Sequence, residues 1–392
     1  MTIKKKIICN NLVVLGLISL ASISLNSCAI TENKSKYNCV TLDSTLSGNL
    51  AALGLKPTYQ SLYNSSSWIP DYIKKLNINT EVAKQPSNSN AELWLSRFTN
   101  LVYGFSYQKP FDLSSYGFKH FLEDKNFYNS NVIPAFVNKI DKNAEFMAKT
   151  WSFKDKLLYL ATNLNNVLKN KDNTPLFQSV DQTIDSIMFK YDLKIKAFKE
   201  KLNNSKLSIS FWGQSYGPNS VMNENNFTEY GPSTNYPGWL FDSLGFVPAT
   251  PSNTEYKLKI FDNGGFNAVG WMPNTGSYNA IGVQKAFENS SDYIVVSLNL
   301  NLNLNLYKNK ILEVFRPMLK ENSTKSISDD SKIILIQDSI SLQPYNLLGV
   351  EDTINLLATK ILNNQDAQIV IKQQIFDTSK LKTISNENFN FI

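Results

Sequence analysis

Residues 180–202 read VDQTIDSIMFKYDLKIKAFKEKL, a stretch near the middle of the 392-residue chain that contains neither glycine nor proline. Its apolar residues recur every three or four positions, at Val180, Ile184, Ile187, Met188, Tyr191, Ile195, Phe198 and Leu202. This period predicts an amphipathic helix, about 35 Å long at a rise of 1.5 Å per residue. An ordinary surface helix is the alternative interpretation. The central position and the length favour a helical spine between two lobes.

Helical patterns and short apolar runs occur on both sides of this helix. The patterns predict further helices at residues 42–53 (closed by Gly54), 151–168 and 350–362. The apolar runs predict strands at residues 101–104, 207–212, 293–296 and 332–336. Helices that alternate with short strands indicate an α/β fold. The chain is too long for one ordinary core, which favours two domains.

The first 28 residues have the composition of a secretory leader. Lys4, Lys5 and Lys6 precede an uncharged apolar run from Leu12 to Leu25, and small residues follow. This order predicts a signal peptide at residues 1–27. The sequence Leu25-Asn-Ser-Cys28 resembles a bacterial lipobox, which implies that Cys28 becomes the acylated N-terminus; a plain N-terminal anchor helix is the alternative. Polar residues 28–39 then form a tether.

Charge and cysteine content exclude several other classes of protein. The formal net charge of +6 falls to about +3 once the three leader lysines are removed, and no basic stripe remains, so we expect no nucleic-acid partner. Of the three cysteines only Cys39 would stay unmodified, so no disulfide is expected. The single histidine, His120, argues against a zinc or manganese receptor. We therefore expect no metal site and no resident cofactor.

Residues 213–217, GQSYG, match the G-x-S-x-G pattern of serine hydrolases. In that pattern the serine is followed along the chain by an acid and then by a histidine. His120 precedes Ser215, and Pro218 follows where a helix would have to begin. We therefore expect a loop here and no enzymatic activity.

Two segments of the second half have distinctive local patterns. Asp262-Asn-Gly-Gly265 lies between apolar runs and predicts a β-hairpin. Residues 297–306 alternate leucine with asparagine, which predicts a strand with one apolar face. Slippage in the coding sequence explains that regularity equally well.

The order of these elements resembles the siderophore, haem and cobalamin class of substrate-binding proteins of ABC transporters. The resemblance runs from about Leu42 to Leu362. It rests on a helix ending in Leu53-Gly54, a proline-led helix with Glu92, a tryptophan helix from Trp151, the long helix from Val180, the strand and loop at Phe211–Gly217, and a helix ending in Leu244-Gly245. The family's Pro-Asp before the next strand is absent at Thr99-Asn100, and the hairpin and the Asn/Leu run are insertions.

The resemblance implies an α/β fold of two Rossmann-like lobes joined by one long spine helix, with the ligand cleft between the lobes. The expected parts are an N-terminal lobe at 40–179, the spine at 180–202, a C-terminal lobe at 203–365 and a loosely ordered tail at 366–392. The implied function is a monomeric, lipid-anchored receptor on the outer face of the cell membrane. Such a receptor binds an iron chelate, a siderophore or haem-like compound, and delivers it to the subunits of an ABC permease. A surface adhesin or a structural lipoprotein without a cleft is the alternative.

Aromatic residues at the expected strand ends and loops are the candidates to face a planar chelate. They are Tyr63, Trp68, Tyr103, Tyr107, Trp212, Tyr216 and Tyr236. Arg316 and Lys109 are the candidate charge partners. For each residue taken alone, an ordinary core or surface position is the alternative.

The resemblance also implies one docking acid on each lobe, which pairs with an arginine of the permease. Glu92 matches the position in the N-terminal lobe. In the C-terminal lobe the matching position falls near Gly238, which has no carboxylate, so Asp242 or Glu229 is the expected substitute.

Overall fold

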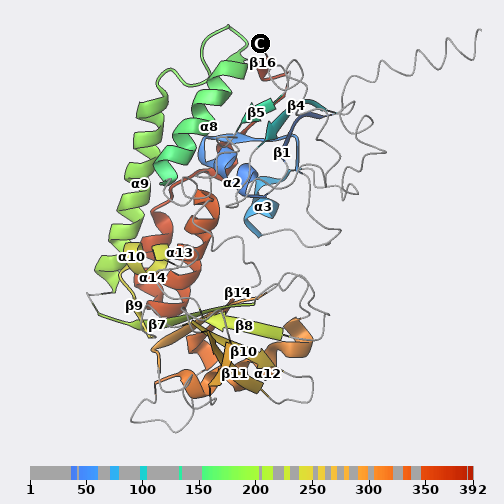
Figure 1. Cartoon of the computed structure of the whole chain (residues 1–392). Helices are drawn as coiled ribbons and strands as arrows, with labels where there is room; N and C mark the ends of the chain where they lie inside the picture. Colours follow the sequence, from blue (N-terminus) through green and yellow to red (C-terminus); the bar gives the residue numbers. More distant parts are fainter. Residues whose placement is uncertain are drawn as a thin grey trace, which may run out of the picture.

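The computed structural model (Figure 1) describes residues 37–41, 44–60, 71–78, 98–103, 132–134, 152–202, 205–214, 225–229, 238–249, 255–260, 266–271, 278–281, 290–298, 304–320, 330–336, 346–385 and 387–391. Among these residues, no helix has both the length and the apolar character needed to cross a membrane. The predicted leader and Cys28 lie outside the described residues.

The first sheet is parallel throughout its described strands. Its order is β3 (Tyr59–Gln60), β1 (Tyr37–Thr41), β4 (Phe98–Tyr103) and β5 (Val132–Pro134). Helix α2 (Ser44–Ala52) connects β1 to a short strand β2 (Leu55–Lys56). Gly54 lies between them with a φ of +78°, a conformation that glycine adopts without steric cost, so the predicted helix end is confirmed.

The long helix expected from the sequence is α9 (Val180–Lys201), 22 residues long. Ser179 caps its start by accepting a hydrogen bond from the backbone N–H of Gln182 at 3.3 Å. It contacts α8 (Phe153–Val167) on the side of the first sheet and α10 (Gly238–Leu244) on the side of the second. Figure 1 shows α9 running along one side of the molecule from the level of β5 down to β7 and β9.

The second sheet is mixed. Strands β7 (Ser208–Gln214), β13 (Tyr293–Ser297) and β14 (Ile333–Ile336) are parallel, with the short parallel strand β9 (Val247–Pro248) beside β7. Strands β8 (Asn225–Glu229), β10 (Glu255–Ile260), β11 (Phe266–Trp271) and β12 (Tyr278–Ile281) continue it antiparallel. The pairing of β10 with β11 confirms the predicted hairpin.

The Asn/Leu run does not form the single strand that its alternation predicts. Ser297 ends β13, and Leu304 already begins α12 (Leu304–Phe315). Asn and Leu are both compatible with a helix, and in α12 the contacts of Ile311 and Phe315 with the sheet decide the conformation. The strand prediction is therefore wrong for residues 304–306.

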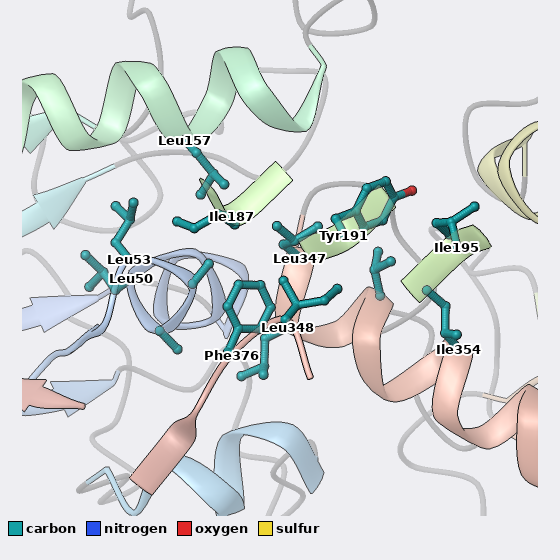
Figure 2. Close-up of a cluster of buried hydrophobic side chains, with 14 of the residues drawn as sticks. Leu50, Leu53, Leu157, Ile187, Tyr191, Ile195, Leu347, Leu348, Ile354 and Phe376 are labelled. Carbon is teal, nitrogen blue, oxygen red and sulfur yellow. The ribbon is translucent and has the colours of Figure 1, made fainter. Parts of the chain in front are cut away.

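Two clusters of buried apolar side chains hold these parts together. The first cluster includes Leu50 of α2, Leu157 of α8, Ile187, Tyr191 and Ile195 of α9, Phe211 and Val295 of the second sheet, and Leu347, Leu348 and Ile354 of α13 (Leu347–Ile361). Figure 2 labels ten of its side chains, which come from α2 and the residue that follows it, from α8, α9 and α13, and from the segment after α14. The second cluster covers the opposite face of the second sheet and joins Trp212, Phe227 and Val296 to Ile311 and Phe315 of α12. The parallel strands of the second sheet are thus buried on both faces, which explains why they carry apolar side chains on both sides.

The C-terminal residues are ordered, which corrects the expected loose tail at 366–392. Helix α14 (Asn364–Lys372) packs on α13 and α9. Beyond it, β15 (Lys382–Thr383) pairs with β2, and β16 (Phe389–Phe391) pairs with β6 (Leu168–Asn170). Ile384 and Phe389 join the first cluster. Helix α13, expected to belong to the C-terminal lobe, also packs against α2 and α3 (Asp71–Leu76), so residues 346–391 belong largely to the first-sheet side.

Candidate functional site

The carboxyl ends of the first-sheet strands lie at one edge, because the strands are parallel. Thr41 is in register with both Gln60 and Val102, and Tyr103 is in register with Pro134. Open α/β sheets bind their ligands in the crevice beyond this edge. It is therefore the candidate functional edge of the first sheet.

The second sheet has an equivalent edge at the ends of β7, β13 and β14. Ser297 lies in register between Gly213 and Ile336. Several predicted site residues follow the two edges directly along the chain. Tyr103 ends β4, Tyr63 and Trp68 come after Gln60, Tyr107 and Lys109 come after Tyr103, and Tyr216 comes after Gln214. Apart from Tyr103 these residues, together with Tyr236 and Glu92, lie outside the described residues, and all of them stay predictions.

Trp212 does not lie in a loop. It is inside β7, 1% exposed, and its indole ring packs on Phe315 with ring centroids 5.4 Å apart. Its Nε1 donates to Ser210 Oγ at 3.1 Å. The sequence pattern placed the end of the strand at this residue, whereas β7 continues to Gln214. The ring therefore fills the second cluster, and the prediction that it faces a ligand is corrected.

Arg316 lies near the opposite edge of the second sheet. It follows α12 in a short 3-10 helix (Arg316–Met318), and the Met318 carbonyl accepts a hydrogen bond from the backbone N–H of Ser291, just before β13. Its guanidinium makes a two-pronged ion pair with Asp330, at 2.6 and 2.7 Å, and this hydrogen bonding holds the pKa of Asp330 below its usual value. Arg316 is thus paired with Asp330 at the amino ends of the strands. The prediction that it contacts a ligand at the carboxyl edge is therefore corrected.

Polar residues at the amino edge of the second sheet are hydrogen-bonded to one another. Asp292 Oδ2 accepts from the backbone N–H of Ser208 at 2.7 Å, from Ser208 Oγ at 2.9 Å and from Lys320 Nζ at 3.1 Å. Burial acts to raise the pKa of Asp292, but these hydrogen bonds outweigh it and hold the pKa below its usual value. Asp292 and Ser208 therefore have their hydrogen-bond partners within the fold.

The two candidate docking acids of the second sheet differ in accessibility. Asp242 is exposed on α10, as a docking residue must be. Glu229 is 4% exposed at the end of β8, where it is in register with Trp212. A carboxylate at that depth cannot meet a partner protein at the surface, so Glu229 is excluded as the substitute.

Two polar residues at the carboxyl edges were not predicted. Gln60 and Ser297 are each 1% exposed, and neither the Gln60 Oε1 and Nε2 atoms nor Ser297 Oγ has a hydrogen-bond partner among the described residues. Buried polar groups are normally paired. The sequence signal for such a position is a polar residue that ends an otherwise apolar strand, but this signal does not tell whether the group is paired.

The described residues contain no group of three or more His, Cys, Asp or Glu side chains placed to hold a metal ion. Cys39 is a free thiol in this part of the chain, and burial in β1 raises its pKa above the usual value. Its sulfur is therefore held as a neutral, buried group.

No family model and no curated protein matches the sequence. The solved structures that are similar include SirA of Staphylococcus aureus, with 16% identity and a TM-score of 0.44 over 83% of this chain and 98% of that one. The periplasmic catecholate-siderophore binding protein VctP of Vibrio cholerae has 12% identity and a TM-score of 0.44 over 82% and 93%. BSU3320 of Bacillus subtilis has 13% identity and a TM-score of 0.46 over 83% and 95%.

BSU3320 is described as a periplasmic binding protein component of a ferrichrome ABC transporter. The class that these descriptions name is the class that the sequence resembles. All three TM-scores lie below 0.5 and all three identities below 25%, so we take neither ligand nor partner from them.

Proposed function

We propose that this chain is a lipid-anchored receptor on the outer face of the cell membrane that binds an iron chelate between two lobes and delivers it to an ABC permease. The observation that supports it is the presence, among the described residues, of two separate sheets that each contain parallel strands, and of a long helix, α9, that contacts α8 beside the first sheet and α10 beside the second. In this proposal α9 is the spine, the two edges face the ligand, and no reaction is catalysed.

The aromatic candidates fit this role by their place in the chain. Tyr63, Trp68, Tyr103, Tyr107 and Tyr216 each end a parallel strand or follow its carboxyl end. Aromatic rings supply large, rigid contact area to a planar chelate, and a cation such as Lys109 would balance its charge. We propose these residues, together with Tyr236, as the ligand contacts of the two lobes.

A fluorescence titration tests the proposal. The chain has six tryptophans, so a ferric trihydroxamate, a ferric tricatecholate, ferric citrate and haemin can each be titrated against their emission. We expect saturable 1:1 quenching by at least one of them, with a dissociation constant of about 1 μM or lower. Trp68→Ala should weaken that quenching, and free tryptophan corrects for absorption by the chelate. Binding of extracellular surfaces but of none of the four chelates would favour the adhesin instead.

The anchor is tested through Cys28. We expect Cys28→Ala to remove metabolic labelling by palmitate and to move the protein to the soluble or unprocessed fraction, because one acyl cluster holds it to the membrane. Cys39→Ala is the matched control, since Cys39 is buried in β1, and it should stay labelled. Palmitate on the Cys28→Ala variant would contradict the lipobox interpretation.

The docking role of Glu92 and Asp242 is tested by uptake. Exposed charge pairs orient a complex and speed its formation, and each contributes only about 0.2 to 1 kcal/mol. We expect Glu92→Ala to reduce uptake of the chelate and to make it less sensitive to salt, while binding by the isolated receptor is unchanged. Asp242→Asn should act in the same direction. Uptake at the wild-type rate by both variants would remove the docking role.

A further inference from the structure

The carboxyl edge of the first sheet contains one satisfied and one unsatisfied polar residue side by side. Thr41 and Gln60 are the last residues of β1 and β3 and are in register. Thr41 Oγ1 is hydrogen-bonded to Ser47 Oγ of α2 at 2.6 Å. Both polar atoms of the neighbouring Gln60 side chain, by contrast, lack a partner among the described residues. An unmade hydrogen bond in a buried position destabilises the folded state, so an unpaired carboxamide needs an explanation.

The second sheet repeats this situation at the end of β13. Ser297 follows Val295 by two positions, so its side chain points to the face that the first cluster covers. Its neighbours across the sheet are Gly213 and Ile336, and neither carries a polar side chain. The Ser297 hydroxyl is therefore also left unpaired at a carboxyl edge.

The start of α13 lies beside α2, and both helices belong to the apolar cluster that also covers one face of the second sheet. Asn346 caps α13 and lies against Gly48 of α2, the residue after Ser47. Ile336, the neighbour of Ser297, belongs to the same apolar cluster as Leu347 and Leu348 of α13. One unpaired group thus lies at the edge of the first sheet, beside the strand that α2 is hydrogen-bonded to, and the other lies at the edge of the second sheet, beside a residue of the cluster to which α2 and α13 also belong.

We propose that Gln60 and Ser297 are ligand-contacting residues, one from each sheet, whose unpaired atoms are satisfied by the bound chelate. This inference rests on the proposed function. A carboxamide both donates and accepts, as does a hydroxyl, and both are uncharged. They therefore suit an uncharged donor–acceptor part of a chelate, such as the secondary amides of its backbone, and not its charged iron-binding groups. Gln60 and Ser297 are each 1% exposed in the structure. Binding of a ligand to them therefore includes a conformational change that exposes their side chains.

The test uses substitutions that remove the polar atoms and keep the volume, Gln60→Met and Ser297→Ala. If the groups are reserved for a ligand, each variant of the full-length, ligand-free protein should melt at the same temperature as the wild type or about 2 °C higher. Each should also bind an amide-bearing ferric trihydroxamate about 3- to 10-fold more weakly. Binding of ferric tris(acetohydroxamate), which has no further amide, should change less.

Ser208→Ala is the matched control. Ser208 lies at the opposite end of β7, and its hydroxyl is hydrogen-bonded to Asp292. This variant should melt at a lower temperature and should bind the trihydroxamate as the wild type does.

Three results would overturn the inference. If Gln60→Met and Ser297→Ala leave the affinity unchanged, the two groups do not contact the ligand, although the proposed function stands. If the melting temperature falls together with the affinity, the groups belong to the fold. If the wild type binds none of the ferric probes, the proposed function fails and the inference fails with it.

Discussion

Replacing Gly48 with alanine is expected to lower the free energy of unfolding by about 2 to 4 kcal/mol. In an unconstrained helix the same change would be stabilising by up to about 1 kcal/mol. The sign reverses here because a Cβ atom on Gly48 would lie 2.0 Å from Oδ1 and 2.5 Å from Cγ of Asn346. The Asn346 carboxamide cannot yield freely, since its Oδ1 accepts from the backbone N–H groups of Leu348 and Gly349 and so caps α13. Urea denaturation followed by circular dichroism measures the loss.

The control for this prediction is a second substitution, Asn346→Ser. Serine is a good N-cap and is one atom shorter, so Asn346→Ser alone should change stability by less than about 1 kcal/mol. Combined with Gly48→Ala, it should recover most of the loss, because the clash is removed while the cap remains. An equal loss from Gly48→Ala in both backgrounds would mean that α2 and α13 do not meet at these residues.

Replacing Lys194 with methionine should lower the free energy of unfolding by about 3 to 5 kcal/mol. Lys194 is fully buried on α9, 3.4 Å from Glu351 Oε1 of α13, and it donates to the carbonyls of Val370 at 3.1 Å and Gln373 at 3.0 Å. Burial lowers the pKa of Lys194 and raises the pKa of Glu351, and the attraction between the two groups opposes both shifts. Removing the ammonium leaves a carboxylate in the core whose remaining partners are the backbone N–H groups of Ile375, at 2.9 Å, and of Phe376.

Two variants separate this effect from general damage to the helix contact. Lys201→Met breaks the 3.0 Å ion pair between Lys201 of α9 and Asp366 of α14. Because both side chains are partly exposed, this variant should lower the free energy of unfolding by less than about 1 kcal/mol. Adding Glu351→Gln to Lys194→Met removes the stranded charge and should restore part of the stability. If Lys194→Met and Lys201→Met cost the same, the buried pair does not hold α9, α13 and α14 together.

The features that the sequence predicts well are those encoded by local patterns. The period of apolar residues in 180–202 gives α9 almost to the residue. The two Leu-Gly helix ends are also confirmed, because Gly54 and Gly245 have φ values of +78° and +79°, where a side chain would be strained.

The features that it misses depend on contacts between distant segments. The residues of β15 and β16 carry no strong strand pattern, and they are ordered because β2 and β6, more than 200 residues earlier in the chain, supply their hydrogen bonds. Arg316 was misplaced for the same reason, since only the return path of α12 decides which edge of the sheet it reaches. Trp212 was misread because parallel strands covered on both faces do not alternate.

In the candidate site, too, some features follow from local sequence and others depend on contacts between distant segments. The sequence places the aromatic candidates after expected strand ends, and those outside the described residues stay predictions. The pairing state of Gln60 and Ser297 depends on neighbours from other strands. A hydrogen bond that is missing has no sequence signature of its own. The sequence marks both positions only as polar residues at strand ends, and the structure shows that their side chains are buried and unpaired.

The role that we propose for this chain is to carry an iron chelate. It is tested by native mass spectrometry of the full-length protein, purified in mild detergent from cells that produce it and then supplied with the four ferric probes in turn. We expect a complex heavier than the free protein by the mass of one ferric chelate, with iron and protein in a 1:1 ratio. Only the free protein, in the extract and after addition of every probe, would contradict it.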